Sequence, residues 1–343
     1  MKSLLTVLKY GLLLALSGAL MVYAVRGQDL SRIGHYIATA NYFWLGLTMM
    51  LSVLGYLSRA YRWQMQLTAS RHRVGFWAVY HAMMVGYLAN IVLPRMGEVI
   101  RCSVLRRTSG VPVEVSLGTV ITERVIDVLM LALLLGAVLL MEFNKFWSFI
   151  QGLFVDKYDS LAAHRTLLLA VAGIAVLLLL VFGWLLVRNL EKLRQNALFG
   201  KVVGFVKGLL GGVFSVLKLE NKGVFLFHTV FTWAVYYLMD YLAFFCFPET
   251  YNLDMKAGLA VLTFGAFGMA APVSGGIGVF HVLVQSTLLV YGISKEAGIA
   301  YALVVHGAQT LLVVLLGGIS FVASAMQSGK TVNNEQLAVS GER

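Results

Sequence analysis

Ionisable residues gather at two neighbouring places in an otherwise apolar chain: Arg95, Glu98 and Arg101, and then Glu123, Arg124 and Asp127. Glu98 and Arg101 are three residues apart, so they can pair on one helix face. Glu123 and Asp127 are four residues apart on a shared face, where like charges repel. A cation must lie between these two carboxylates, most simply Arg95 or Arg101. The spacing therefore predicts a network of arginines and carboxylates.

Two roles are open for this network. It can simply hold a broken helix in place, because charges at membrane depth are costly unless they are paired. Alternatively, some arginines bind an anionic lipid headgroup, since the guanidinium fork donates two parallel hydrogen bonds to phosphate. Asn90, just before the break at Pro94, either caps the broken helix or contacts the headgroup.

A second break, at residues 272–278, carries Ser274, Gly275 and Gly276. Glycines free backbone N–H groups at a helix start, which favours anion binding, but a tight turn between packed helices is an equal alternative. Four further polar residues lie in apolar stretches and are candidates for a proton or polar relay: Asp240, His281, His306 and Gln309. Polar helix packing is the alternative role for the histidines, and a hydrogen bond to a neighbouring tyrosine is the alternative for Asp240.

The composition predicts a membrane protein. The 343 residues are 59% hydrophobic and 13% charged, whereas soluble proteins carry about 25% charged residues. The net charge of +11 is explained by basic loops that face anionic headgroups, so no nucleic-acid partner is expected. Two cysteines make no disulfide framework, and no metal or cofactor motif is found.

The elements that must position these residues are helices. We expect an all-α polytopic protein with about six full spans, at 4–25, 42–57, 113–143, 166–187, 224–247 and 298–325. Two re-entrant hairpins are expected at 76–107 and 257–291, together with an outer loop at 144–165, an interfacial helix at 198–217 and a tail at 326–343. In this topology, 18 Lys and Arg lie on cytoplasmic segments and 7 on outer ones. The positive-inside rule then places both termini in the cytoplasm, and the first span reads as a retained helix.

The two halves of the chain match in order. Residues 1–143 and 166–325 each contain two spans, a hairpin broken at Pro-x-x-Gly and a long span. The first half starts inside and the second outside, which predicts inverted repeats. Transporters with this architecture place their site at the midplane, between the repeats.

Three motifs carry a family resemblance: residues 90–98 with Arg101, residues 123–127, and residues 272–280. Together they resemble the lysylphosphatidylglycerol synthase transmembrane-region family of flippase-like membrane proteins, over about residues 4–325. The resemblance implies a bacterial inner-membrane lipid translocase, a stand-alone member without a synthase or glycosyltransferase domain. Its expected partners are membrane lipids, an anionic phospholipid or aminoacyl-phospholipid, with a separate lipid-modifying enzyme as a further candidate. Family members often have an acidic residue where this chain has His281.

Three functions follow as hypotheses. The first is a lipid flippase or scramblase with no catalytic role. The second is a membrane-embedded transferase or hydrolase that uses Glu98, Glu123 and Asp127 as acid and base. The third is a scaffold for a separate lipid-modifying enzyme. The oligomeric state is left open.

Overall fold

The structure, a computed structural model, describes residues 2–162 and 219–341. Within these ranges all regular structure is helical, which confirms the all-α class. The helices are α1 Lys2–Val25, α2 Leu30–Thr39, α3 Tyr42–Ala69, α4 Phe76–Val92, α5 Gly97–Ser109, α6 Val113–Ala162, α10 Lys222–Ala243, η2 Phe244–Cys246, α11 Met255–Ala270, η3 Ser274–Gly276, α12 Val279–Val290 and α13 Lys295–Gly341.

Four described helices, α3, α6, α10 and α13, are long and apolar enough to cross a bilayer. They coincide with four of the six predicted spans. A fifth span exists only if α1 and α2 count as one, because the chain bends by 92° between them. The predicted span at 166–187 and the interfacial helix at 198–217 lie outside the described residues.

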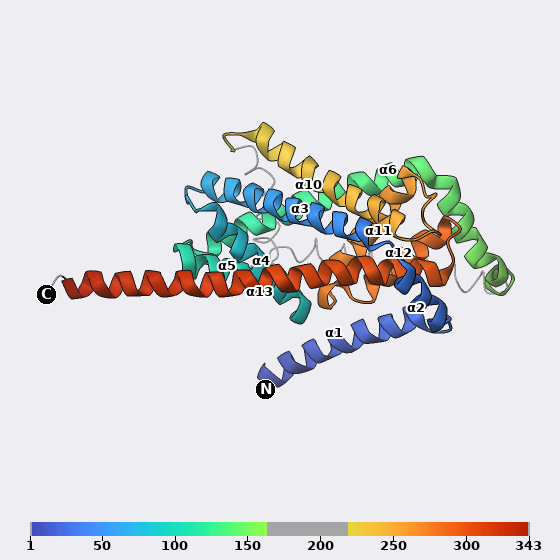
Figure 1. Ribbon diagram of the computed structural model, residues 1–343, viewed down its shortest axis with the longest axis horizontal. Helices are drawn as coiled ribbons and strands as arrows, with labels where there is room; N and C mark the ends of the chain where they lie inside the picture. Colours follow the sequence, from blue (N-terminus) through green and yellow to red (C-terminus); the bar gives the residue numbers. More distant parts are fainter. Residues whose placement is uncertain (1, 163–218, 342–343) are drawn as a thin grey trace, which may run out of the picture.

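Two helical hairpins enter the bundle from opposite ends (Figure 1). Helices α4 and α5 form the first hairpin. The start of α4 and the end of α5 lie at the same end of the bundle, which we call the α5 end. Helices α11, η3 and α12 form the second, which starts and finishes at the opposite, α12 end. The backbones of α4 and α5 approach so closely that a Cβ on Gly97 would lie 2.1 Å from the Gly86 carbonyl oxygen. The first hairpin is thus packed too tightly there for any side chain.

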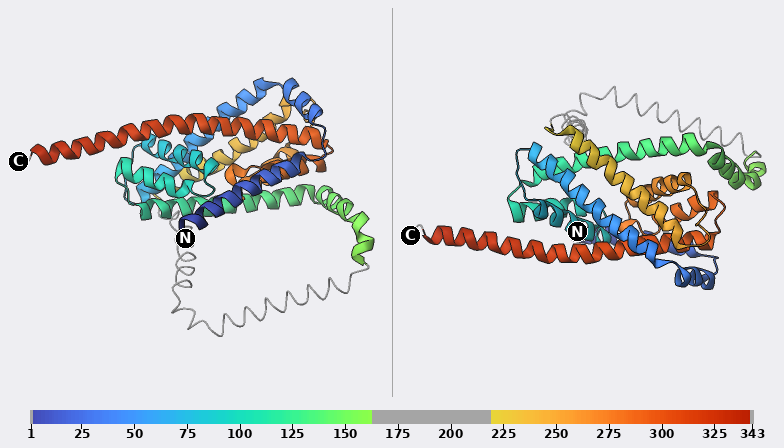
Figure 2. Two further views of the ribbon diagram at one scale, coloured as in Figure 1. Left: turned by 90° about the horizontal axis from the view of Figure 1, so that it is seen from below. Right: turned by 45° about the horizontal axis from the view of Figure 1, so that its top comes forward.

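Long helices surround the hairpins. Helix α3 packs against α10, α13 runs along both α4 and α12, and α6 contacts α5 and α11 (Figures 1 and 2). The buried apolar residues form two clusters, one around α3 to α6 and the other around α11 to α13. Each hairpin therefore has an apolar core of its own.

Three helices run further than the sequence predicts. Helix α3 continues past residue 57 to Ala69, and α13 continues past residue 325 to Gly341. Helix α6 continues through most of the predicted outer loop at 144–165, with one non-helical residue at Glu142. None of these extensions contains a proline, so nothing in the backbone chemistry stops the helix.

Candidate functional site

A cluster of ion pairs lies where α3, α5 and α6 meet. Glu123 is only 1% exposed, and its carboxylate accepts from Arg59 and, at 2.9 Å, from Arg101 Nη2. Asp127 accepts from Arg62 Nη2 at 2.9 Å and from Arg59 Nη2 at 3.1 Å. Arg124 reaches both carboxylates, at 3.0 Å and 3.1 Å. The predicted network exists, and Arg101 is one of the predicted cations within it.

Arg59 and Arg62 correct the sequence analysis, which ended the second span at residue 57 and so left both arginines in the connection to the first hairpin. They lie on α3 and are buried in the cluster. Arg59 Nη1 also donates to the Tyr236 hydroxyl at 3.3 Å, and so ties the cluster to α10. The signal that could have revealed them is helical spacing, since residues 59, 62, 63 and 66 share one face of a continued helix.

Trp63 likewise lies beyond residue 57, the predicted end of the second span. It is fully buried, and its indole N–H donates to Thr119 Oγ1 at 2.9 Å. The Arg101 guanidinium lies 4.6 Å from the centre of the indole ring, a cation–π distance. Trp63 therefore supports Arg101 from α3 while it binds α6.

The cluster has more donors than acceptors. Four guanidinium groups face two carboxylates, so positive charge exceeds negative by two among these six side chains. Within the described part of the chain, Nε and Nη1 of Arg101 are buried without a hydrogen-bond partner, as are the Nε atoms of Arg59, Arg62 and Arg124. A buried donor without an acceptor costs about 1–3 kcal/mol. The cluster therefore contains buried N–H donors that its own carboxylates leave without an acceptor.

The cluster lies inside the bundle, away from both of its ends. Glu123 is ten residues after the start of α6, and Arg59 is ten residues before the end of α3. At 1.5 Å per residue, each lies about 15 Å from the α5 end, about a third of the way across a bilayer of 40–45 Å and so within its hydrocarbon core. Arg124 is at the edge of the cluster, with 38% of its side chain exposed.

Arg95 does not join the carboxylates, contrary to one of the two predicted alternatives. It lies at the tip of the first hairpin with a left-handed backbone, φ +65°. Its guanidinium donates to the carbonyl oxygen of Ala270, the last residue of α11. The same two tips touch again where Gly275 lies against the backbone of Ile91. The two breaks therefore meet, at a contact where Arg95 and Ala270 are both exposed.

Two other predicted residues of the first hairpin have different surroundings. The Asn90 side-chain oxygen accepts from the Gly97 backbone N–H at 2.7 Å, so Asn90 caps the start of α5. Glu98 does not form the predicted ion pair with Arg101, because Arg101 turns toward Glu123. One Glu98 carboxylate oxygen is buried without a partner in the described ranges.

The second break is built from glycines that no other residue replaces easily. Gly276 and Gly278 have φ of +79° and +85°. A Cβ on Gly278 would lie 2.6 Å from Leu20 Cβ, because α1 packs directly on the break. Ser274 is buried; its backbone N–H donates to Ser17 Oγ at 3.3 Å, and its own hydroxyl has no partner among the described residues.

Of the four relay candidates, the structure brings together only the histidines. The His281 and His306 rings are 4.9 Å apart, and His281 Nδ1 accepts from the Gly278 N–H at 3.3 Å. Tyr301 donates to the backbone oxygen of Asp240, not to its carboxylate. Across the described ranges, the side chains of Asp240 and Gln309 form no hydrogen bond, so no continuous relay joins the four.

Fold and site together define a class: multi-pass α-helical membrane proteins whose two broken hairpins meet beside a buried ion-pair cluster. The family described as "Lysylphosphatidylglycerol synthase TM region" matches residues 10–317. The chain belongs to this family, and is therefore a membrane protein tied to lipid metabolism. No curated protein and no solved structure matches it significantly.

Proposed function

We propose that the protein is a lipid translocase, which moves an anionic phospholipid or a lipid-linked headgroup between the two leaflets of the bacterial inner membrane. The observation that carries this proposal is the buried ion-pair cluster with its surplus of arginine donors. A phosphate oxygen at Arg101 or Arg124 would satisfy donors that the carboxylates leave unpaired. The headgroup passes this cluster while the acyl chains stay in lipid.

The position of the cluster on α6 supports access from the bilayer. Helix α6 exposes Val128, Leu129 and Leu133 beyond the cluster, so this face of the helix suits contact with acyl chains. Arg124 is on the same helix and is partly exposed. A headgroup can therefore reach Arg124 from the side without first crossing the apolar cores.

The meeting of the two hairpin tips supports alternating access. Broken helices that face each other at mid-depth occur in transporters built from inverted repeats, which rock around a fixed site. We propose the same motion here, with the contacts between Arg95 and Ala270 and between Ile91 and Gly275 as the region that changes. With both termini in the cytoplasm, the α5 end opens to the inner leaflet.

The ion pairs argue against an acid–base role for the cluster. Glu123 and Asp127 each contact at least three guanidinium groups, which stabilise the ionised form and occupy the carboxylate oxygens. A general acid or base must reach a substrate proton within hydrogen-bonding distance. We therefore propose transport without chemistry as the function of this site.

The test is lipid crossing in proteoliposomes that contain fluorescently labelled phosphatidylglycerol. We expect the full chain to accelerate crossing, and Arg124→Gln to slow it by about tenfold, the effect of one lost charge-assisted hydrogen bond. Arg106→Gln is the matched control, because Arg106 is exposed on α5 outside the cluster. Equal crossing rates with and without protein, for several lipid classes, would refute the proposal.

A further inference from the structure

A second charged site lies at the α12 end of the molecule. Glu142 interrupts α6 with φ −129° and ψ 20°, and it is only 7% exposed. Its carboxylate forms ion pairs with Lys145 Nζ at 2.9 Å and with Lys256 Nζ at 3.5 Å. Lys145 is one turn further along α6, and Lys256 is in the first turn of α11. Two lysines from different helices thus converge on one carboxylate.

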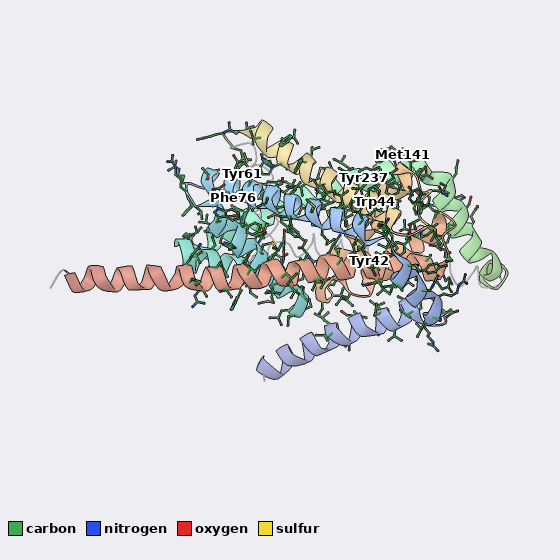
Figure 3. The ribbon with its side chains drawn as sticks, viewed as in Figure 1. Tyr42, Trp44, Tyr61, Phe76, Met141 and Tyr237 are labelled. Atoms are coloured by element: carbon green, nitrogen blue, oxygen red, sulfur yellow. The ribbon has the colours of Figure 1, made fainter. Side chains whose placement is uncertain are left out.

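This site lines a shallow cavity of about 800 Å³ that is widely open at the surface. One part of the lining is apolar and comes from Leu140, Met141 and Phe143; the polar part includes the two lysines and the carboxylate. Figure 3 shows Met141 far along the bundle from Phe76 and Tyr61, which lie toward the α5 end. The cavity is therefore amphipathic and lies at the other end of the bundle from the α5 end.

The depth of this site matches the lipid headgroups. Helix α6 runs without interruption from Val113 to the kink at Glu142, which corresponds to about 44 Å at 1.5 Å per residue. A bilayer with its headgroup regions is about 40–45 Å thick. If the α5 end lies at one membrane surface, the two lysines lie among the phosphates of the other.

The two lysines have N–H donors that the ion pairs with Glu142 do not occupy. An ammonium group carries three N–H donors, and the carboxylate of Glu142 uses one from each lysine. Both side chains are nearly half exposed. Lys145 Nζ also lies 4.4 Å from the Tyr291 ring centre, a cation–π distance. Charge and exposure both suit an anionic oxygen between the two lysines.

We infer that this cavity binds the phosphate group of an anionic phospholipid in the leaflet at the α12 end, between Lys145 and Lys256, with an acyl chain against Leu140, Met141 and Phe143. Glu142 holds the two lysines near each other when the site is empty, and it competes with the phosphate for their ammonium groups. The inference goes beyond translocation and does not depend on it, since a lipid can bind here in a protein that moves none.

The test is native mass spectrometry of the full chain in non-ionic detergent, titrated with short-chain phosphatidylglycerol. We expect Lys256→Gln to weaken binding by about tenfold, as loss of one charge-assisted hydrogen bond requires. Lys295→Gln is the matched control, since Lys295 is exposed at the same end of the bundle and outside the cavity. Glu142→Gln should tighten binding, because it removes the competing carboxylate.

Competitors separate the two sources of phosphate. Inorganic phosphate should not displace phosphatidylglycerol, and zwitterionic phosphatidylcholine should bind more weakly. Equal affinity in Lys256→Gln and Lys295→Gln, or displacement by inorganic phosphate at matched concentration, would overturn the inference. Weaker binding in Glu142→Gln with an unchanged thermal midpoint would overturn it too. Loss of transport in the Arg124 variant has no bearing on these results.

Discussion

The Arg95 guanidinium donates to the Ala270 carbonyl oxygen, so the tip of one hairpin closes the end of the broken helix in the other. The last carbonyls of a helix have no partner within it, and they carry the negative end of the helix dipole. A cation there donates hydrogen bonds to these carbonyls and also compensates the negative end of the dipole. Arg95 thus acts as a C-terminal cap supplied by a distant part of the chain.

Substitutions at Arg95 should distinguish the stability lost with the helix cap from the stability cost of the strained backbone. Arg95→Gly and Arg95→Ala both remove the guanidinium, but only glycine adopts φ +65° at no steric cost. We expect Arg95→Ala to lower the free energy of unfolding by about 1 kcal/mol more than Arg95→Gly. Denaturant unfolding in detergent measures the difference.

Arg106 provides the control for this comparison, because it is exposed in a regular part of α5. There the order should reverse, with glycine about 1 kcal/mol worse than alanine. The same order at both positions would contradict the strained backbone at Arg95.

Glu123→Gln should be severely destabilising. It removes the negative charge that four buried or partly buried guanidinium groups share. Breaking a buried ion pair by removing one partner costs about 3–5 kcal/mol, because the remaining charges stay buried. Glu114→Gln, on the exposed first turn of α6, should change stability by less than about 1 kcal/mol. Similar losses in the two variants, by thermal unfolding in detergent, would show that the cluster is hydrated rather than buried.

Trp63 should matter both through its ring and through its N–H group. Trp63→Phe keeps an aromatic face under Arg101 but loses the hydrogen bond to Thr119, which costs about 1 kcal/mol. Trp63→Leu loses the cation–π contact as well, so we expect a larger drop in the free energy of unfolding. Trp77→Phe is the control, because Trp77 is 59% exposed and should change stability little. Equal effects of Phe and Leu at position 63 would refute the role of the ring.

Gly278→Ala should loosen α1 from the second hairpin. The added Cβ would lie 2.6 Å from Leu20 Cβ and 2.8 Å from the Ser17 carbonyl oxygen, and φ +85° is itself unfavourable for alanine. We expect faster protease cleavage between α1 and α2 and a lower thermal midpoint. Gly307→Ala is the control, because nothing lies near that glycine on α13 and alanine favours helix by about 1 kcal/mol. An unchanged cleavage rate in Gly278→Ala would contradict the packing of α1 on the break.

The sequence was sufficient to predict the class of the fold and the existence of the charge network. The scarcity of charge requires lipid around most of the surface, and a chain in lipid must satisfy its backbone within helices. Glu123 and Asp127 on one helix face required cations nearby. These conclusions rest on composition and local spacing, which do not depend on how the helices pack.

The tertiary structure decided which cations pair with Glu123 and Asp127. Counting charges near the ends of apolar runs assigns Arg59 and Arg62 to a loop. Such a count takes no account of carboxylates that are 64 to 68 residues away in the chain but adjacent in the fold. The same distance in sequence hides the bond from Arg95 to Ala270. A buried charge is tolerated only next to its partner, and helix packing alone brings those partners together.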